Sequence, residues 1–177
     1  MKLGLVTYNI ASTWDLETVL RVCQEVGLAG VELRTSHAHG VEISLNEAQR
    51  REVAARFADS PVHLVGLGST YEYHSPDPAE LRRQIDGTKA AVRLAAAVGA
   101  DGVKVRPNAL PEGIPAERTL AQIGRALNEV AADAADFGVE IRLEVHGKTT
   151  CLPPNLAAIM AAAPHPNAKV CWNSNYP

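Results

Sequence analysis

One unit recurs along this chain: an amphipathic helical pattern, a glycine, and then a short run rich in β-branched residues. The unit appears at residues 26–34, 98–106 and 137–144. In each copy the first glycine stands where a helix C-terminus favours a left-handed residue, and an apolar run typical of a buried strand follows at once. Such short connections are typical of repeated βαβ units, so the pattern predicts an α/β fold on a parallel sheet.

Six strands and five helices are predicted in strict alternation. The predicted strands are residues 3–9, 30–35, 62–68, 102–107, 139–145 and 168–173. The predicted helices are residues 14–26, 46–58, 78–98, 115–137 and 155–162. No linker or low-complexity segment divides them, so we expect one domain over residues 1–177.

Start signals accompany three of the predicted helices. Asp77 and Pro78 supply an N-cap and a proline at the first helical position. Residues 12–15 and 44–47 both fit the capping-box pattern. These signals indicate where the helices begin.

A parallel sheet is either open or closed into a barrel, and the strand ends favour the barrel. A dinucleotide-binding open sheet carries G-x-G-x-x-G after its first strand, whereas residues 7–12 contain no glycine. Residues 66–68 form a lone Gly-x-Gly, which we expect to be a turn. The strand ends instead carry polar side chains, as barrel enzymes do: Tyr8, Asn9, Glu32, Arg34, His63, Lys104, Arg106, Glu144, His146, Asn173 and Asn175. The predicted fold class is a parallel (β/α) barrel of TIM type, with about six of its eight βα units present.

Composition excludes several functional classes. The formal net charge of −3 gives no electrostatic reason to expect nucleic acid as a partner. No stretch approaches the ~20 apolar residues that a membrane span needs. The three cysteines form no C-x-x-C pair and are expected to be free thiols. Since the start of the chain lacks a signal-peptide pattern, we expect a cytoplasmic protein.

The densest polar cluster is Arg-Leu-Glu-Val-His-Gly at residues 142–147. Side chains alternate along a strand, so Glu144 and His146 share one face. A carboxylate and an imidazole at a barrel mouth could bind a divalent metal, or hold a substrate hydroxyl and exchange a proton with it. Alternatively, Glu144 pairs with a neighbouring Arg or Lys at the barrel rim. The spacing alone leaves these hypotheses open.

Three segments carry a resemblance to a known family. Residues 143–147 (Leu-Glu-Val-His-Gly), 165–175 and 30–34 resemble the xylose-isomerase-like barrel superfamily. Sugar-phosphate isomerases and epimerases, inosose dehydratases and endonuclease IV-type enzymes belong to that superfamily. The resemblance runs over the whole chain, and it implies the same barrel fold as the repeated unit does.

The resemblance also implies a metal site. In the family a divalent metal (Mn, Mg, Co or Zn) is usually held by Glu, Asp, His and Glu at the ends of strands five to eight. Glu144 matches the first ligand, and Asn173 falls at the second, where the family generally has a carboxylate. The other two would lie on strands seven and eight, beyond this sequence. We therefore expect any metal held by Glu144 and Asn173 to bind weakly.

The activity that the resemblance implies is a metal-dependent isomerase or epimerase acting on a small sugar or sugar phosphate. Glu144 is the expected catalytic residue. Glu32, Arg106 and His146 resemble substrate-side positions, and His63, near the third strand, is expected on the substrate side too.

Three other functional classes remain open. A dehydratase or lyase acting on a polyol would use the same scaffold. A DNA-repair endonuclease shares the barrel, but the net charge of −3 argues against it. The third is a non-catalytic barrel fragment that acts as a binding or oligomerisation module. Six strands leave open sheet edges, so we expect a homo-oligomer in which this chain alone lacks part of the site.

Overall fold

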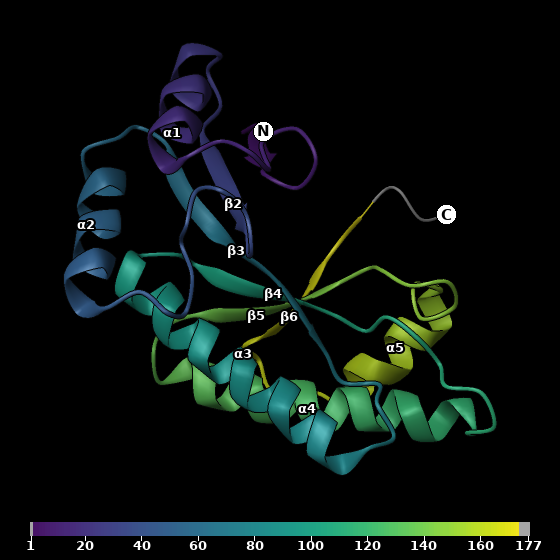
Figure 1. Ribbon diagram of the computed structural model, residues 1–177. Helices are drawn as coiled ribbons and strands as arrows, with labels where there is room; N and C mark the ends of the chain where they lie inside the picture. Colours follow the sequence, from purple (N-terminus) through teal and green to yellow (C-terminus); the bar gives the residue numbers. More distant parts are fainter. Residues whose placement is uncertain (1, 174–177) are drawn as a thin grey trace.

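The computed structural model describes residues 2–173, in which six strands alternate with five helices (Figure 1). The strands are β1 (Gly4–Val6), β2 (Gly30–Arg34), β3 (His63–Glu72), β4 (Gly102–Arg106), β5 (Glu140–Glu144) and β6 (Ala168–Cys171). The helices are α1 (Leu16–Glu25), α2 (Glu47–Ala58), α3 (Pro78–Val98), α4 (Ala116–Ala135) and α5 (Pro153–Ala161).

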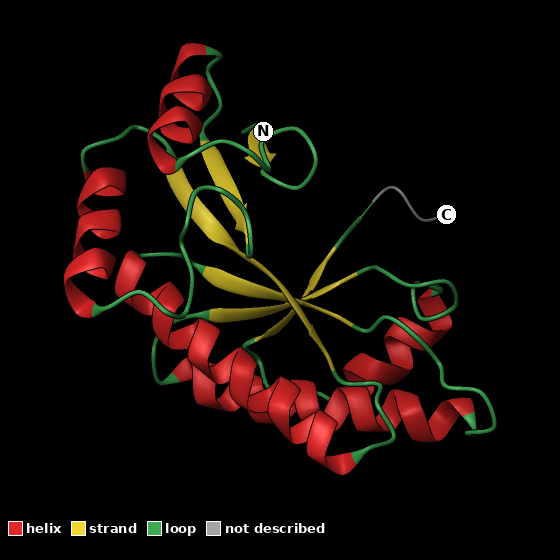
Figure 2. Ribbon diagram, in the orientation of Figure 1, coloured by secondary structure: helices red, strands yellow, loops and turns green. Residues whose placement is uncertain are grey.

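The strands form one sheet in the order β1-β2-β3-β4-β5-β6, and every neighbouring pair is parallel. The helices follow one another along the outside of the curved sheet (Figure 2). The α/β fold with parallel strands in sequence order is therefore confirmed, and it corresponds to part of a TIM-type barrel. Because all strands run the same way, their carboxyl ends meet at one edge of the sheet.

Helix starts lie close to the predicted positions, but two capping boxes were misplaced. The N-cap of α1 is Asp15, whose side chain accepts a hydrogen bond from Thr18 N at 2.8 Å. In α2 the capping box joins Asn46 and Gln49, two residues later than predicted. The prediction failed because several Ser, Thr, Asp and Asn residues stand near each start, and each is a good N-cap. By contrast, α3 has the predicted bounds.

The third strand is longer than predicted, and the Gly-x-Gly at residues 66–68 lies inside it rather than in a turn. A Cβ on Gly66 would lie 2.9 Å from the backbone oxygen of Gly102 on β4. A Cβ on Gly68 would lie 2.8 Å from Glu32 Oε1, which reaches over from β2. Both glycines therefore allow groups of neighbouring strands to approach the backbone closely, which is one reason why glycine occurs inside a strand.

The hydrophobic core lies between the sheet and the helices. Its largest fully buried side chains include Leu33, Leu67 and Ile141 on strands and Ile123 and Leu127 on α4. The three cysteines are free thiols, as expected. No helix within residues 2–173 has the length and apolar character needed to cross a bilayer.

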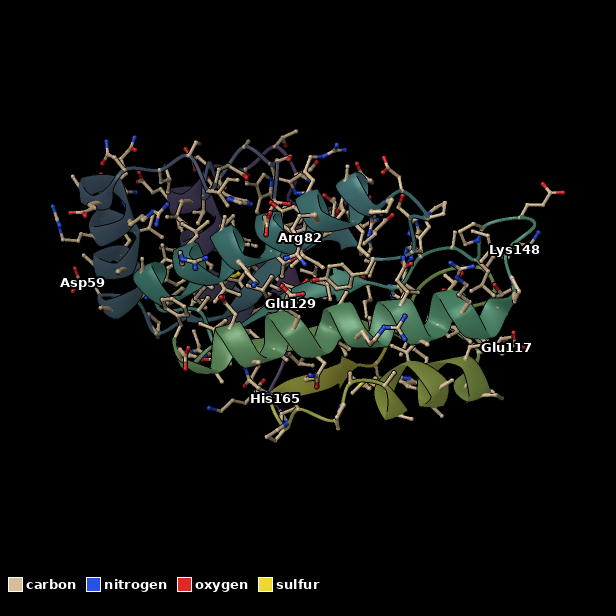
Figure 3. All side chains as sticks on the ribbon, turned by 90° about the horizontal axis from the view of Figure 1, so that it is seen from below. Asp59, Arg82, Glu117, Glu129, Lys148 and His165 are labelled. Atoms are coloured by element: carbon tan, nitrogen blue, oxygen red, sulfur yellow. The ribbon has the colours of Figure 1, made fainter. Side chains whose placement is uncertain are left out.

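An ion-pair cluster joins α3 to α4 on the outer surface (Figure 3). Glu129 Oε1 lies 2.8 Å from Arg82 Nη1 and 3.0 Å from Lys89 Nζ. The hydrogen bond from Arg82, together with Lys89, lowers the pKa of Glu129 to about 2. Because Arg82 and Glu129 are both more than a third exposed, solvent screening leaves this cluster only a modest share of the stability.

The contact between α4 and α5 depends on a glycine. A Cβ on Gly124 would lie 2.5 Å from the Cβ of Ala162 and closer still to the carbonyl oxygen of Ile159. A helix interior normally prefers alanine to glycine by about 1 kcal/mol. The absence of a side chain at position 124 thus lets α5 lie directly on α4, and α5 leads into β6.

We predict that Gly124→Ala lowers the free energy of unfolding by about 1–3 kcal/mol, because overpacking at this contact outweighs the helix-propensity gain. Urea denaturation followed by circular dichroism measures the change. Ala132→Gly, at an exposed position of the same helix, is the control, and it should cost about 1 kcal/mol through propensity alone. A Gly124→Ala protein more stable than wild type would contradict this account of the packing.

Candidate active site

A cavity of about 460 Å³ opens at the carboxyl edge of the sheet. It is lined by side chains from all six strands or the residues just after them. The polar members are Tyr8, Glu32, Arg34, Ser69, Lys104, Arg106, Glu144, His146 and Asn173. Apolar and sulfur atoms come from Val6, Cys171 and Trp172.

Strand alternation explains why so many charges share this cavity. On β2, Glu32 and Arg34 are two positions apart and therefore face the same side, and Lys104 and Arg106 repeat this spacing on β4. Glu144, at the end of β5, and His146 repeat the pattern, as the sequence predicted.

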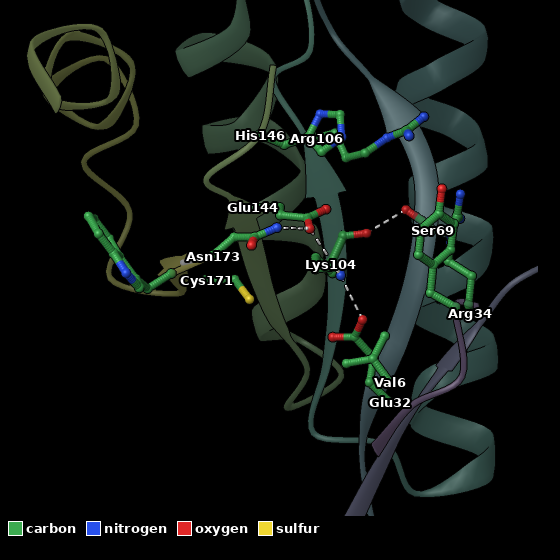
Figure 4. Close-up of a pocket in the computed structure, with 12 residues that line it drawn as sticks. Val6, Glu32, Arg34, Ser69, Lys104, Arg106, Glu144, His146, Cys171 and Asn173 are labelled. Atoms are coloured by element: carbon green, nitrogen blue, oxygen red, sulfur yellow. Dashed lines mark hydrogen bonds and ion pairs between the residues drawn. The ribbon is translucent and has the colours of Figure 1, made fainter. Parts of the chain in front are cut away.

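Lys104 lies at the centre of the cavity, between two carboxylates (Figure 4). Its Nζ is 2.8 Å from Glu32 Oε1 and 3.5 Å from Glu144 Oε1. All three side chains are nearly buried, with 11% of Lys104, 11% of Glu32 and 13% of Glu144 exposed. Burial alone would lower the pKa of Lys104, but the two carboxylates outweigh burial and leave the pKa raised. Lys104 is therefore a charged ammonium at neutral pH.

Glu144 has a second partner on the next strand. Glu144 is paired with Cys171 in the β5–β6 ladder, so Asn173, two residues further on, can reach the same face. The side-chain nitrogen of Asn173 donates a hydrogen bond to Glu144 Oε1 at 3.0 Å. The predicted convergence of Glu144 and Asn173 is present.

A second polar cluster, around Glu72, lies beside the first. Glu72 ends β3 and forms an ion pair with Arg106. Its other oxygen, Oε2, accepts a hydrogen bond from Asn108 Nδ2 at 2.7 Å, and it lies 3.6 Å from His74 Nδ1. These contacts fix the guanidinium of Arg106 at the wall of the cavity.

Arg34 lies on the other side of the cavity and has no carboxylate within 4 Å among residues 2–173. Its Nη1 donates to the Gly68 carbonyl at 3.2 Å, and its guanidinium lies 5.8 Å from the centre of the Tyr8 ring. Burial, reinforced by the nearby charge of Arg106, lowers the pKa of Arg34. An anionic group in the cavity would stabilise this guanidinium.

His63 is not part of the cavity, which corrects the sequence prediction. It is the first residue of β3, so it lies at the amino end of the strand, whereas the cavity lies at the carboxyl end. Its Nε2 lies 2.7 Å from Asp101 Oδ2, and more than half of its side chain is exposed. His63 also stands at the start of the predicted strand 62–68, and the starts of parallel strands lie at the edge of the sheet opposite to the cavity.

Lys104, in the cavity, and Glu72, beside it, are two residues important to this site that the sequence does not single out. Lys104 could have been found, because it stands two residues before Arg106 in the same strand. The sequence analysis left open that Glu144 pairs with a neighbouring Arg or Lys at the barrel rim. Glu144 does pair with Lys104, but inside the cavity. Glu72 gave no usable signal, since the predicted third strand ended before it.

The match to a protein family agrees with this architecture. Residues 20–174 match the family described as xylose isomerase-like TIM barrel. This chain belongs to that family. The resemblance inferred from the strand-end motifs is thus confirmed. No curated protein matches this xylose isomerase-like chain in sequence.

Solved structures of three proteins show the same fold. The IolI protein with a bound zinc atom has a TM-score of 0.79 at 18% identity over 96% of this chain. The probable 3-DHS dehydratase AsbF from Bacillus anthracis gives 0.76 at 17% identity over 97%. D-psicose 3-epimerase with D-tagatose, from Clostridium cellulolyticum H10, gives 0.78 at 16% identity over 97%. This xylose isomerase-like chain spans 62%, 62% and 63% of those chains, respectively.

The described residues of this family member do not form a divalent-metal site by themselves. Within residues 2–173, no three His, Cys, Asp or Glu side chains converge as metal ligands would. At Glu144, where the sequence predicted a metal, Oε1 faces the ammonium of Lys104 and the amide nitrogen of Asn173. The zinc in the IolI structure is a property of that protein.

His146 supplies a titration test of this site. Burial lowers the pKa of His146, while the charge of Glu144 raises it in part. We predict that His146 titrates below the ordinary value of an exposed histidine, and that Glu144→Gln lowers its pKa further. Imidazole NMR signals recorded against pH measure both values. Glu140→Gln, on the same strand but outside the cavity, is the control and should leave the pKa unchanged.

The lowered pKa of His146 also determines how its contribution to folding stability changes with pH. Because the folded-state pKa is the lower one, the unfolded chain takes up the proton first as pH falls. The contribution of His146 to stability is complete above the unfolded-state pKa and is lost as pH falls from there through the folded-state pKa. Replacing His146 by Gln should weaken this acid dependence, and an unchanged dependence would contradict the assignment.

Proposed function

We propose that this domain is the binding and proton-transfer part of an isomerase or epimerase that acts on a small sugar or sugar phosphate. The observation that supports the proposal is the buried Glu32–Lys104–Glu144 group at the carboxyl edge of a parallel sheet. That edge is where barrel enzymes place their catalytic side chains. The cavity of about 460 Å³ has the size of a small-molecule site.

The cavity wall offers groups suited to a polyhydroxylated substrate. The carboxylates of Glu32 and Glu144 and the amide of Asn173 can accept or donate hydrogen bonds to hydroxyl groups. Arg34, which lacks a carboxylate partner within residues 2–173, would hold a phosphate or carboxylate group of the substrate. A neutral polyol and an anionic sugar can thus use different parts of one cavity.

The chemistry follows from a base beside a fixed cation. Glu144 would remove the proton from the carbon next to the substrate carbonyl. The electron pair of the broken C–H bond then forms a carbon–carbon double bond, and the carbonyl electrons move to the oxygen. Lys104 would stabilise this enolate oxygen by a charged hydrogen bond. Return of the proton to the other face of the same carbon gives an epimer. An isomer forms when the hydroxyl on that carbon first passes its proton to the enolate oxygen and becomes the new carbonyl, while Glu144 returns its proton to the former carbonyl carbon.

A second candidate is a dehydratase. The observation that favours it is the position of an ammonium between two carboxylates, which puts a proton donor beside a proton acceptor. After the same proton removal, Lys104 would protonate a departing hydroxyl two carbons from the carbonyl, and water would leave. Mass spectrometry separates the two candidates, since only the dehydratase product lacks the elements of water.

Hydrogen exchange tests the proposal. We predict that the protein incorporates solvent deuterium next to the carbonyl of at least one member of a panel of ketoses and ketose phosphates. Glu144→Gln should slow this exchange by about 100-fold or more, because it removes the base. Glu140→Gln, at the amino end of the same strand and outside the cavity, is the matched control. NMR of the incubated sugars in D₂O measures the exchange.

Two results would contradict the proposal. One is a Glu144→Gln protein that exchanges substrate hydrogen as fast as wild type. The other is a wild-type protein that exchanges none of the sugars and shows no shift of its His146 or Lys104 NMR signals when they are added.

A further inference from the structure

We propose that the ammonium of Lys104 is the resident cation of this cavity, and that it replaces a divalent metal at Glu144. The inference deepens the proposed function and rests on the same cavity, but it concerns which cation the carboxylates hold. It is therefore tested by metal binding rather than by turnover.

The backbone is shaped to bring this cation and its carboxylates together. Glu32 is on β2 and Lys104 is on β4, so their ion pair must pass over β3, which lies between them. Gly68 occupies β3 directly beside Lys104, in the β3–β4 ladder. A Cβ there would lie 2.8 Å from Glu32 Oε1. The glycine leaves the space through which Glu32 reaches Lys104.

The carboxylates at the cavity already have cationic partners. Glu32 and Glu144 are paired with Lys104, and Glu72, beside the cavity, is paired with Arg106, so none of these three carboxylates lacks a cation, and Arg34 adds a further positive charge to the wall. A divalent ion bound to Glu144 would lie next to the Lys104 ammonium, whose Nζ is 3.5 Å from Glu144 Oε1. The ammonium and the metal ion would repel each other strongly, because two positive charges would lie close together in a buried site.

The side chain of Asn173 is also better suited to a Glu144 carboxylate that is paired with Lys104 than to one that binds a metal. Asn173 presents its side-chain nitrogen, a hydrogen-bond donor, to Glu144 Oε1. Two donors therefore converge on the oxygen to which a metal would bind. An oxygen that accepts a hydrogen bond from an amide and forms an ion pair with an ammonium already has two favourable partners.

The arrangement assigns a catalytic role to Lys104. An ammonium carries three N–H donors, and its described carboxylate partners are two, Glu32 and Glu144. The remaining donor is available for a substrate oxygen. Lys104 can thus supply the positive charge for an enolate oxygen without an exchangeable ion.

Manganese binding tests the replacement. Mn²⁺ is the probe, since it prefers oxygen ligands and is less drawn to the surface histidines than Zn²⁺. Electron paramagnetic resonance of free Mn²⁺ measures binding to the full chain. We expect wild type to show no one-to-one site. Lys104→Met should gain a one-to-one Mn²⁺ site at least about tenfold tighter than any Mn²⁺ binding by the wild type, because the competing charge is gone. The double variant Lys104→Met/Glu144→Gln should lose that gain.

Two controls make the result specific. Lys89→Met removes a lysine of the outer ion-pair cluster and should leave Mn²⁺ binding as in wild type. Lys104→Arg keeps the charge and should also bind no Mn²⁺ one-to-one. Circular dichroism establishes that each variant is folded.

A second measurement covers the case in which Lys104→Met does not fold. In wild type labelled with ¹⁵N-lysine, one equivalent of Mn²⁺ should leave the Lys104 side-chain signals sharp. Their paramagnetic broadening, or tight one-to-one Mn²⁺ binding that Glu144→Gln abolishes, would overturn the proposal. If the metal-binding results are as expected but no sugar exchanges hydrogen with solvent, the proposed activity is rejected and the cation assignment stands.

Discussion

The ion pairs between Lys104 and the carboxylates of Glu32 and Glu144 are the interaction on which the cavity depends. Each of these groups is nearly buried, and a buried charge without a partner is strongly unfavourable. Removing one member of such a group commonly costs about 3–5 kcal/mol, because the remaining charge stays buried and unpaired. The three side chains therefore hold β2, β4 and β5 in one arrangement as well as shaping the chemistry.

The repeated helix–glycine–strand unit was enough to predict the order and direction of the strands. Period-two alternation likewise predicted that Glu144 and His146 would share a face, and both line the cavity with Glu32, Arg106 and Asn173. These features are local or repeat along the chain, so a sequence pattern contains them. The bounds of α3 were predicted for the same reason, because Asp77, Pro78 and Gly99 mark its ends.

What the sequence did not predict depends on contacts between distant segments. His63 was misplaced because its position along β3 decides which edge of the sheet it occupies. The spacing of Lys104 and Arg106 shows that both face the cavity, but the pairing of Lys104 with Glu32 and Glu144 depends on strands that are far from it in the sequence. The Gly-x-Gly at residues 66–68 has the sequence pattern of a turn, and the groups that approach these glycines within the sheet belong to neighbouring strands.

The close approach at Gly68 has an evolutionary consequence. A larger residue there would crowd the Glu32 carboxylate where it reaches Lys104, so the end of that side chain would have to shift. A lineage that loses the lysine is released from the need for glycine, whereas one that keeps the lysine is not. Positions 32, 68 and 104 should therefore vary together among relatives, as one inherited unit spread over three strands.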